Sequence, residues 1–322
     1  MSLLKIQDLK MYFPVRGGVL MRAVAQCKAV DGVSLELGTR ETLGLVGESG
    51  CGKTTLGKAI VRLHKPTGGS IHFEGNDITH AGTRELRPMR RDIQMVFQDP
   101  AESLNPRHTV RDILEEPFIV QKLGTKEQRR AWVVELLEKV GLKSEHSDRF
   151  PFEFSGGQRQ RIGIARAIAL NPKLIVCDEP VSALDVSVQS QVLNLMLDLQ
   201  RDLGLSYLFI AHGLNVVKHM SDRVAVMYLG KVVELAPAET LYRNPLHTYT
   251  KALLDAIPEP DPAKRRPRRL LSGDVPSPIN PPEGCAFGHR MKHPRWKESV
   301  GMDLKLEEVQ PGHWVQKCPC CV

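Results

Sequence analysis

The chain has 322 residues, of which 42% are hydrophobic and 25% are charged, as is usual for a globular protein. No stretch approaches the about 18 consecutive apolar residues of a membrane span, and charged residues come too early for a secretory signal core. We therefore expect a protein that stays in the cytosol and reaches a membrane only through a partner.

The net charge of +7 lies mainly in the last sixty residues, around the basic run at residues 264–269. Such a run suits phospholipid headgroups or nucleic acid, although a solvated linker is the interpretation we prefer. We expect no nucleic-acid partner.

The first chemical motif lies between a predicted strand at residues 41–46 and a predicted helix at about 53–63. Its glycines let the backbone turn tightly so that successive amides point at an anion, and the helix start adds a favourable field. Lys53 is expected to hold the β- and γ-phosphates, and the Thr54 hydroxyl is expected to bind Mg²⁺. The loop consists of Gly47, Glu48, Ser49, Gly50, Cys51, Gly52, Lys53, Thr54 and Thr55.

The next elements are half of a hairpin at residues 70–75 and a strand at 93–97. Gln98 ends that strand, where its amide can touch both the metal and the attacking water. An amphipathic helix at 127–140 follows, with Trp132, Leu136, Leu137 and Val140 on one face.

A second glycine turn, made of Ser155, Gly156, Gly157 and Gln158, opens an apolar helix. It lies too far along the chain to duplicate the first loop. It indicates a second phosphate-facing surface, which makes sense if it closes over the nucleotide of another subunit.

An apolar strand at residues 174–177 runs straight into Asp178 and Glu179. Both acids are expected at the carboxyl edge of the sheet. There Asp178 suits a contact with magnesium, and Glu179 suits the orientation or deprotonation of the attacking water. A helix at 187–203 and a strand at 207–210 follow. His212 ends this strand, where it can donate to a γ-phosphate.

Two short strands around Gly230 and a helix at 249–256 close the region. Helices between successive strands predict an α/β fold with a mainly parallel sheet covered on both faces. Tyr12 and Phe13, near the start of the chain, are expected to precede the first core strands. Either ring can stack on adenine or pack as a core aromatic.

The composition changes at Pro258, because prolines recur from there to Pro282 and exclude regular helix or central strand. We expect a nucleotide-binding domain at residues 1–257, with a helical subdomain at about 100–170. Residues 258–322 are expected to form a small proline-rich, basic appendage.

Residues 1–257 resemble the nucleotide-binding subunit of ATP-binding-cassette (ABC) transporters. The phosphate loop, Gln98, the turn at 155–158, Asp178 with Glu179, the segment 182–185 and His212 stand in that family's order. The resemblance implies a P-loop NTPase fold with an antiparallel β subdomain and a helical subdomain. It also implies a head-to-tail dimer with two ATP molecules at its interface, where Ser155, Gly156, Gly157 and Asp185 of one subunit meet the other's Lys53.

Further segments resemble the oligopeptide/dipeptide importer branch and its second ATPase type (OppF or DppF). They are residues 12–15, 28–33, 99–100, 103–107, 245–254, 276–278 and 281–285. By position Phe13, not Tyr12, matches the adenine-stacking aromatic. Two departures are Gly213, where the family usually carries Asp after the histidine, and Phe154, where many members have Leu.

The tail departs further from the pattern of the family. Some family members bind an iron–sulfur cluster there through four cysteines, but only Cys285 and Cys318 match, with Met291 and Glu298 at the other two positions. We therefore expect no such cluster. Cys318, Cys320 and Cys321 can bind zinc or another soft metal with Cys285, but we prefer a frayed, reduced terminus.

The resulting prediction is an ATPase, with ATP and Mg²⁺ as ligands, that energises import of peptides or a related small solute. Its implied partners are a second ABC ATPase subunit (a copy or a paralogue), two membrane permease subunits and an extracytoplasmic solute-binding protein. It would sit peripherally on the cytoplasmic face of the membrane. The alternatives are an ABC ATPase acting on nucleic acid or ribosomes, and a regulator whose tail senses redox state or metal.

Overall fold

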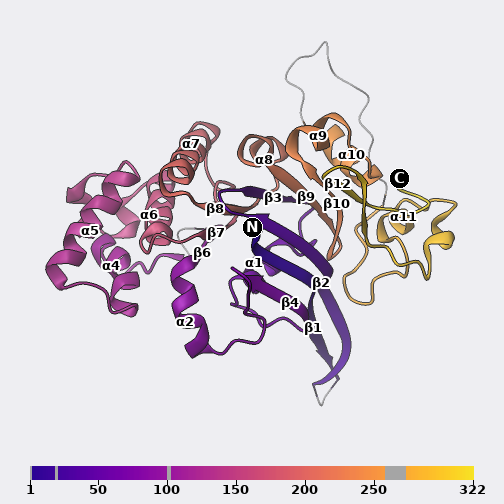
Figure 1. Cartoon of the computed structure of the whole chain (residues 1–322), viewed down its shortest axis with the longest axis horizontal. Helices are drawn as coiled ribbons and strands as arrows, with labels where there is room; N and C mark the ends of the chain where they lie inside the picture. Colours follow the sequence, from indigo (N-terminus) through magenta and orange to yellow (C-terminus); the bar gives the residue numbers. More distant parts are fainter. Residues whose placement is uncertain (1, 19–20, 100–102, 258–272) are drawn as a thin grey trace, which may run out of the picture. The chain divides into compact units, whose positions relative to one another are not determined.

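The computed structural model describes residues 2–18, 21–99, 103–257 and 273–322, which divide into two compact units (Figure 1). The first unit comprises residues 38–41 and 81–210, and the second comprises 2–37, 42–80 and 211–322. Three features of the sequence lie outside the described residues: Pro100, the basic run at 264–269 and the prolines from 258 to 267.

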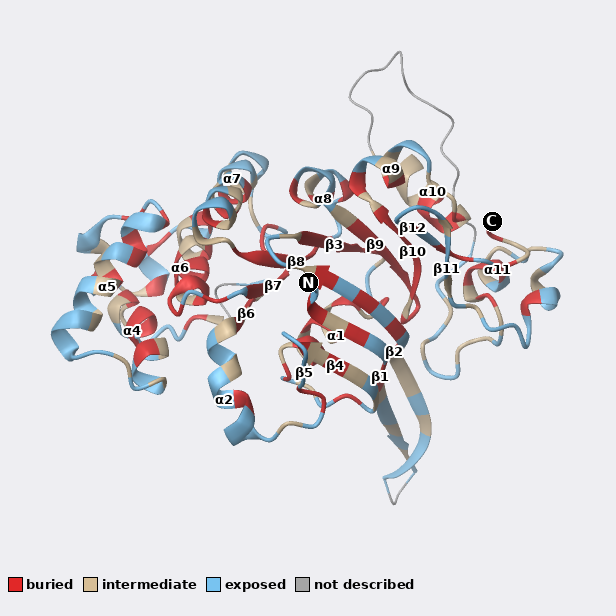
Figure 2. Ribbon diagram, in the orientation of Figure 1, coloured by how far each residue is buried: buried red, intermediate tan, exposed pale blue. Residues whose placement is uncertain are grey.

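The first unit contains three parallel strands in the order β6 (Ile93–Val96), β7 (Leu174–Asp178) and β8 (Ser206–Ile210). Every residue of β7 and β8 is buried, as Figure 2 shows, which is typical of parallel strands covered on both faces. The pairing places Asp178 beside Ile210 at the carboxyl ends of the two strands. These three strands confirm the sequence prediction.

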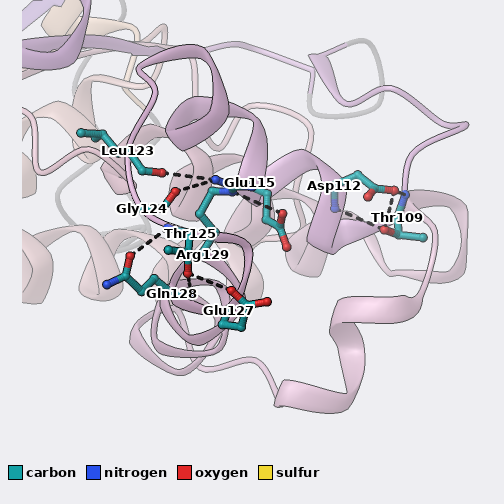
Figure 3. A network of polar contacts seen from close by, with 9 residues as sticks. All are labelled: Thr109, Asp112, Glu115, Leu123, Gly124, Thr125, Glu127, Gln128 and Arg129. Carbon is teal, nitrogen blue, oxygen red and sulfur yellow. Dashed lines mark hydrogen bonds and ion pairs between the residues drawn. The ribbon is translucent and has the colours of Figure 1, made fainter.

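Five helices belong to the described part of this unit, and three of them begin with reciprocal caps. Thr109 and Asp112 cap α4 (Val110–Val120), and Thr125 and Gln128 cap α5 (Lys126–Lys139), with each side chain bonding the other residue's backbone N–H (Figure 3). Such local signals fix where these helices start. The helices are α2 (Thr83–Asp92), α4 (Val110–Val120), α5 (Lys126–Lys139), α6 (Gly156–Ile168) and α7 (Val186–Leu203).

The predicted amphipathic helix is α5, with Leu136 and Leu137 buried as expected. Val133, which the prediction omitted, is buried too. Trp132 is only half-buried, and its ring lies 4.9 Å from that of Phe118 in α4. The apolar face of α5 is therefore centred on Val133, and Trp132 lies at its border.

The second unit contains a four-stranded sheet in the order β2 (Arg22–Gly38), β1 (Ser2–Gly17), β4 (Gly68–Phe73) and β5 (Asn76–Asp77). The predicted hairpin is confirmed, because β4 pairs antiparallel with β5. Tyr12 and Phe13 lie within β1, a strand that was not predicted, and they precede the first predicted strand, which is β3 (Thr42–Val46). Mixed polar and apolar residues in β1 and β2 concealed these long strands.

The same unit contains a second ladder in the order β3 (Thr42–Val46), β9 (Arg223–Tyr228), β10 (Lys231–Pro237), β12 (His313–Gln316) and β11 (Leu306–Gln310). Strands β3 and β9 are parallel, and the other pairs are antiparallel. The β9–β10 hairpin around Gly230 was predicted, but the two tail strands were not. Its helices are α1 (Lys53–Ile60), α8 (Leu214–Met220), α9 (Ala238–Arg243), α10 (Thr248–Asp255) and α11 (Ala286–Arg290).

A buried carboxylate fastens the tail strands to β10. The side chain of Glu234 is fully buried, and its Oε1 lies 2.8 Å from Nε2 of His313 in β12. The same carboxylate accepts the backbone N–H groups of Leu246, at 2.8 Å, and His247, at 3.0 Å. One side chain thus joins β10, β12 and the approach to α10.

We expect Glu234→Ala to lower the free energy of unfolding by about 3–5 kcal/mol, because it leaves buried donors without an acceptor. Urea denaturation followed by circular dichroism measures this change. The matched control is Glu239→Ala, which removes an exposed ion pair with Arg243. It should shift stability by less than about 0.5 kcal/mol. Equal effects of the two substitutions would contradict the role given to Glu234.

Candidate nucleotide-binding site

The loop at residues 47–55 joins the fully buried strand β3 to helix α1. Three of its glycines adopt positive φ values, 155° at Gly47, 78° at Gly50 and 108° at Gly52. A Cβ at Gly52 would lie 2.0 Å from the backbone O of Ala29, and one at Gly47 would lie 2.1 Å from that of Met227. Both positions therefore require glycine, and the resulting turn directs the loop around the start of α1.

We expect Gly52→Ala to destabilise the loop by about 1–3 kcal/mol, through both the clash and the backbone strain. Affinity for a fluorescent ATP analogue should fall by about tenfold or more, since each 1.4 kcal/mol is a factor of ten.

Gly163→Ala is the matched control, because Gly163 lies inside α6 with no atom within 4 Å of the added Cβ. This change should stabilise the protein by about 0.5–1 kcal/mol and leave nucleotide affinity unchanged. Unaltered affinity in Gly52→Ala would show that the loop does not hold phosphate.

Lys53 begins helix α1 and is 4% exposed. Its Nζ lies 2.8 Å from the carbonyl O of Gly47 and 3.0 Å from that of Glu48, so the ammonium is held over the loop. Thr54 and Thr55 follow in the first turn of the helix. A buried cation together with a helix N-terminus makes this loop an anion site suited to phosphates.

Cys51 lies inside the loop and is 2% exposed. Burial raises the pKa of its thiol, although the nearby Lys53 ammonium opposes the shift. The thiol therefore stays protonated at neutral pH and fills space as a small apolar group.

Two residues that the sequence analysis missed hold Glu48 of the loop. The hydroxyl of Tyr249, from α10, accepts the Glu48 backbone N–H at 2.9 Å. Arg290, at the end of α11, places Nη1 2.7 Å from Glu48 Oε2, and the side chain of Arg290 is only 7% exposed. Burial raises the pKa of Tyr249 far above its usual range, so this hydroxyl stays neutral. Nothing in the local sequence signals either contact.

The structure distinguishes the two candidate aromatics near the start of the chain. The Tyr12 hydroxyl donates to the carboxylate of Asp31, and the ammonium of Lys28 lies 5.5 Å from its ring centroid. Phe13 is 37% exposed, and its ring meets that of His64 edge-on, with ring centroids 5.8 Å apart. Its face suits stacking on a base better than that of Tyr12.

His212 lies two residues beyond β8 and is exposed. The backbone N–H of the preceding Ala211 donates to the O of Leu45 in β3, at 3.3 Å. The histidine therefore lies beside the strand that leads into the phosphate loop.

The acidic pair of the first unit lies where the sequence predicted, at the carboxyl end of β7. Asp178 is 3% exposed and Glu179 is 6% exposed. The Nε2 of Gln98 donates to Glu179 Oε2 at 3.0 Å, so the structure brings these two candidates together. Glu179 has a φ of 49°, and its N–H donates to the O of Ile210 at 2.9 Å. Such left-handed backbone is costly for a non-glycine residue and is concentrated at functional sites.

The second glycine turn begins helix α6 with a reciprocal cap. Ser155 Oγ accepts the N–H of Gln158 at 3.3 Å, and Gln158 Oε1 accepts the N–H of Ser155 at 3.0 Å. Ser155 and Gly156 are exposed, whereas a Cβ at the buried Gly157 would lie 2.4 Å from the Val188 side chain in α7. The turn is thus backed by α7 and presents its N-terminal amides outward.

Asp185 is at the N-cap position of α7, makes no side-chain cap hydrogen bond and is exposed, and its neighbour Val186 is 79% exposed. A cavity of about 150 Å³ is lined both by Gln98 and by Ala183 and Leu184, which directly precede Asp185. Its lining is drawn from the Gln98 segment, α6 and the residues before α7: Gln98, Asp99, Gly156, Arg159, Gln160, Pro180, Ala183 and Leu184. The first unit therefore gathers Gln98, the Ser155 turn and the Asp185 segment in one region.

Comparison with known proteins identifies two family models along the chain. One, described as ABC transporter, matches residues 30–182. The other, described as the C-terminal region of oligopeptide/dipeptide transporters, matches residues 233–294. Among the described residues, no helix is long and apolar enough to cross a membrane.

Curated relatives extend this likeness over almost the whole chain. The oligopeptide transport ATP-binding protein AppF of Bacillus subtilis is 53% identical over 319 residues, covering 98% of this chain and 96% of the relative. The dipeptide transport ATP-binding protein DppF of Escherichia coli is 52% identical over 290 residues, covering 90% and 86%. A dimeric structure of the ATP-binding cassette MJ0796, bound to ADP and Pi, matches with a TM-score of 0.65 at 29% identity. That match covers 73% of this chain and 98% of the other.

Proposed function

This chain belongs to the ATP-binding subunits of ABC transporters of the oligopeptide/dipeptide type, and from this premise we propose that it hydrolyses ATP to drive the import of peptides. The observation that carries the proposal is the 3.0 Å hydrogen bond from Gln98 to Glu179. It links a carboxylate suited to orienting water with the start of the helical region. The step that consumes ATP can therefore be transmitted through the Gln98 segment to membrane subunits.

In the proposed site, Lys53 and the loop amides bind the phosphates, and Phe13 stacks on adenine. Glu179 orients or deprotonates the attacking water, and His212 donates to the γ-phosphate. These roles agree with a buried ammonium at the loop and a buried carboxylate held by Gln98.

The magnesium ligands in this proposal are Thr54, Gln98 and Asp178. All three offer oxygen atoms, the donor type that Mg²⁺ prefers, and the Asp178 carboxyl is buried at a strand end. Bound Mg²⁺ neutralises charge on the phosphates of ATP. The protein contributes by placing a hydroxyl, an amide and a carboxylate at the ends of its elements.

The proposal makes each nucleotide site the joint product of two subunits. Ser155, Gly156 and Gly157 of one subunit meet the γ-phosphate held by Lys53 of the other, with Asp185 at the same seam. The exposure of Ser155, Gly156 and Asp185 supports this arrangement, because a turn that meets the nucleotide of another subunit must face solvent in its own chain.

The proposed assembly contains a second ABC ATPase subunit, which is a copy or a paralogue, and two integral membrane permeases. An extracytoplasmic solute-binding protein delivers the cargo, and this subunit lies on the cytoplasmic face of the membrane. The family model of the transporter C-terminal region, matched at residues 233–294, favours transport over an ABC ATPase that acts on nucleic acid or ribosomes.

Uptake of a radiolabelled panel of two- to five-residue peptides tests this function in cells that lack the gene and carry it on a plasmid. We expect Lys53→Ala to reduce uptake to the level of the deletion strain, because the phosphates lose their buried cation. Lys58→Ala, on the same helix α1, should support normal uptake. Normal peptide uptake without the gene would contradict the proposed function.

A further inference from the structure

Four cysteines from two distant parts of the tail meet in one cluster. Cys285 precedes α11, whereas Cys318, Cys320 and Cys321 follow β12. Their sulfur atoms all lie within 4.8 Å of one another. Cys285, Cys318 and Cys321 are at most 5% exposed, so the frayed terminus predicted from the sequence was wrong.

The spacing of the sulfur atoms identifies the kind of site. Sγ of Cys285 lies 3.4 Å from Sγ of both Cys318 and Cys321. Sγ of Cys320 lies 3.5 Å from that of Cys318 and 4.0 Å from that of Cys321. Four thiolates at about 2.3 Å from one tetrahedral zinc ion would be about 3.8 Å apart. In a four-iron cluster each cysteine binds a separate iron, which spreads the sulfur atoms more widely.

We propose that Cys285, Cys318, Cys320 and Cys321 bind a single soft divalent metal ion of the zinc class as a tetrathiolate. The ligand set differs from the four-cysteine pattern of iron–sulfur relatives, since two of its members come from the last three residues of the chain. These four ligands can hold the tail in place even though Met291 and Glu298 stand where that pattern has cysteines.

Neighbouring groups favour thiolates at this site. The backbone N–H of Gly288 donates to Cys285 Sγ at 3.2 Å. His247 Nδ1 accepts the N–H of Tyr249 at 3.1 Å, which places the imidazole proton on Nε2. That Nε2 is buried and has no oxygen or nitrogen partner among the described residues. The side chain of His247 hydrogen-bonds that of Cys318, so this donor faces the cluster.

The backbone also leaves room for the cluster. A Cβ at Gly288 would lie 2.3 Å from Cys320 Sγ and 3.5 Å from Cys285 Sγ. Only glycine at this position lets helix α11 approach the sulfur atoms so closely. A hydrogen-bonded outer shell and a shaped backbone are what metal sites require beyond their ligands.

The cluster connects to the phosphate loop by two routes that both end at Glu48. Cys285 is the N-cap of α11, and at the end of that helix the guanidinium of Arg290 is paired with the Glu48 carboxylate. The carbonyl O of Cys321 accepts the N–H and the hydroxyl of Thr248, each at 2.9 Å, at the start of α10. The next residue, Tyr249, accepts the Glu48 N–H. Metal binding therefore stabilises the position of Glu48 in the phosphate loop. We expect it to raise the affinity for ATP as well, an expectation that rests on the proposed function.

Metal analysis of the full chain, purified under reducing and anaerobic conditions, tests the site itself. We expect about one zinc per chain, and Co²⁺ exchanged into the protein should give the absorption of tetrahedral thiolate coordination. Cys318→Ser should lose the ion, whereas the control Cys27→Ser, at a half-buried position in β2, should keep it. If Cys318→Ser does not fold, chelation and zinc restoration of the wild-type chain replace it.

Three results would overturn the metal site. They are a reduced wild-type chain without stoichiometric metal, disulfides among the four cysteines in that preparation, and iron accompanied by acid-labile sulfide.

The link to the loop is tested by titrating a fluorescent ATP analogue before and after chelation. Removal of the metal should weaken wild-type affinity by roughly fivefold or more, a normal size for coupling between sites. In Arg290→Met the affinity should change less on chelation, because one of the two routes is cut. Equal wild-type affinity with and without metal would overturn the coupling. Absence of binding by the metal-loaded chain would instead contradict the nucleotide site.

Discussion

Glu179→Gln is expected to lower ATP turnover by about 10²–10⁴-fold, the usual contribution of a positioned general base. The amide keeps the shape of the side chain but cannot accept a proton from water. ATP binding should persist, because Lys53 and the loop glycines belong to a different segment. The variant should therefore accumulate as an ATP-bound dimer, measurable by light scattering alongside phosphate release.

The control for this substitution is Glu135→Gln, on the exposed side of α5. It should hydrolyse ATP at the wild-type rate and show no ATP-dependent accumulation of dimer. Undiminished turnover in Glu179→Gln would remove Glu179 from its proposed role.

Ser155→Arg is expected to lower turnover by about 10²–10³-fold, comparable to removing a donor that stabilises developing charge. The long side chain fills the space in front of the exposed helix N-terminus, so the turn cannot approach a partner's γ-phosphate. Loss of the cap should cost about 1 kcal/mol of stability, which is too little to unfold the chain.

Binding of ATP to the variant's own loop should be unchanged in the same analogue titration. The matched control, Ser144→Arg, adds the same charge at an exposed serine away from the turn and should be fully active. A Ser155→Arg chain with wild-type turnover would contradict the shared site.

The nucleotide loop was predictable because its information is local. Gly47 and Gly52 have the φ values that only glycine adopts easily, and the flanking strand and helix follow from apolar patterning. The capping boxes at Thr109 and Ser155 are equally local, since each involves residues three apart. Such signals can be read from a single chain.

The contacts around Glu48 and the tail were not predictable for the opposite reason. Arg290 and Glu48 are 242 positions apart, and no local pattern relates them. The prolines after residue 257 concealed two short strands, of which β12 is held by a pair between buried Glu234 and His313. The positive φ of Glu179 depends on its bond to Ile210 in another strand.

The cysteine cluster shows how spacing along the chain can mislead. Of the four cysteine positions in the iron–sulfur pattern of the family, only two carry cysteine in this chain, namely Cys285 and Cys318. The fold nevertheless turns the last residues back so that Cys320 and Cys321 complete the set. The outcome depended on the pairing of β12 with β10, which the sequence did not reveal.

The most direct test of the shared site is the ATP turnover of an equimolar mixture of Lys53→Ala and Ser155→Arg chains. Each variant alone should be inactive, because both sites of its dimer contain a defect. Half of the dimers in the mixture pair the two variants and regain one intact site, so turnover should recover to about a quarter of the wild-type value. A mixture no more active than its two components would contradict a nucleotide site built from two subunits.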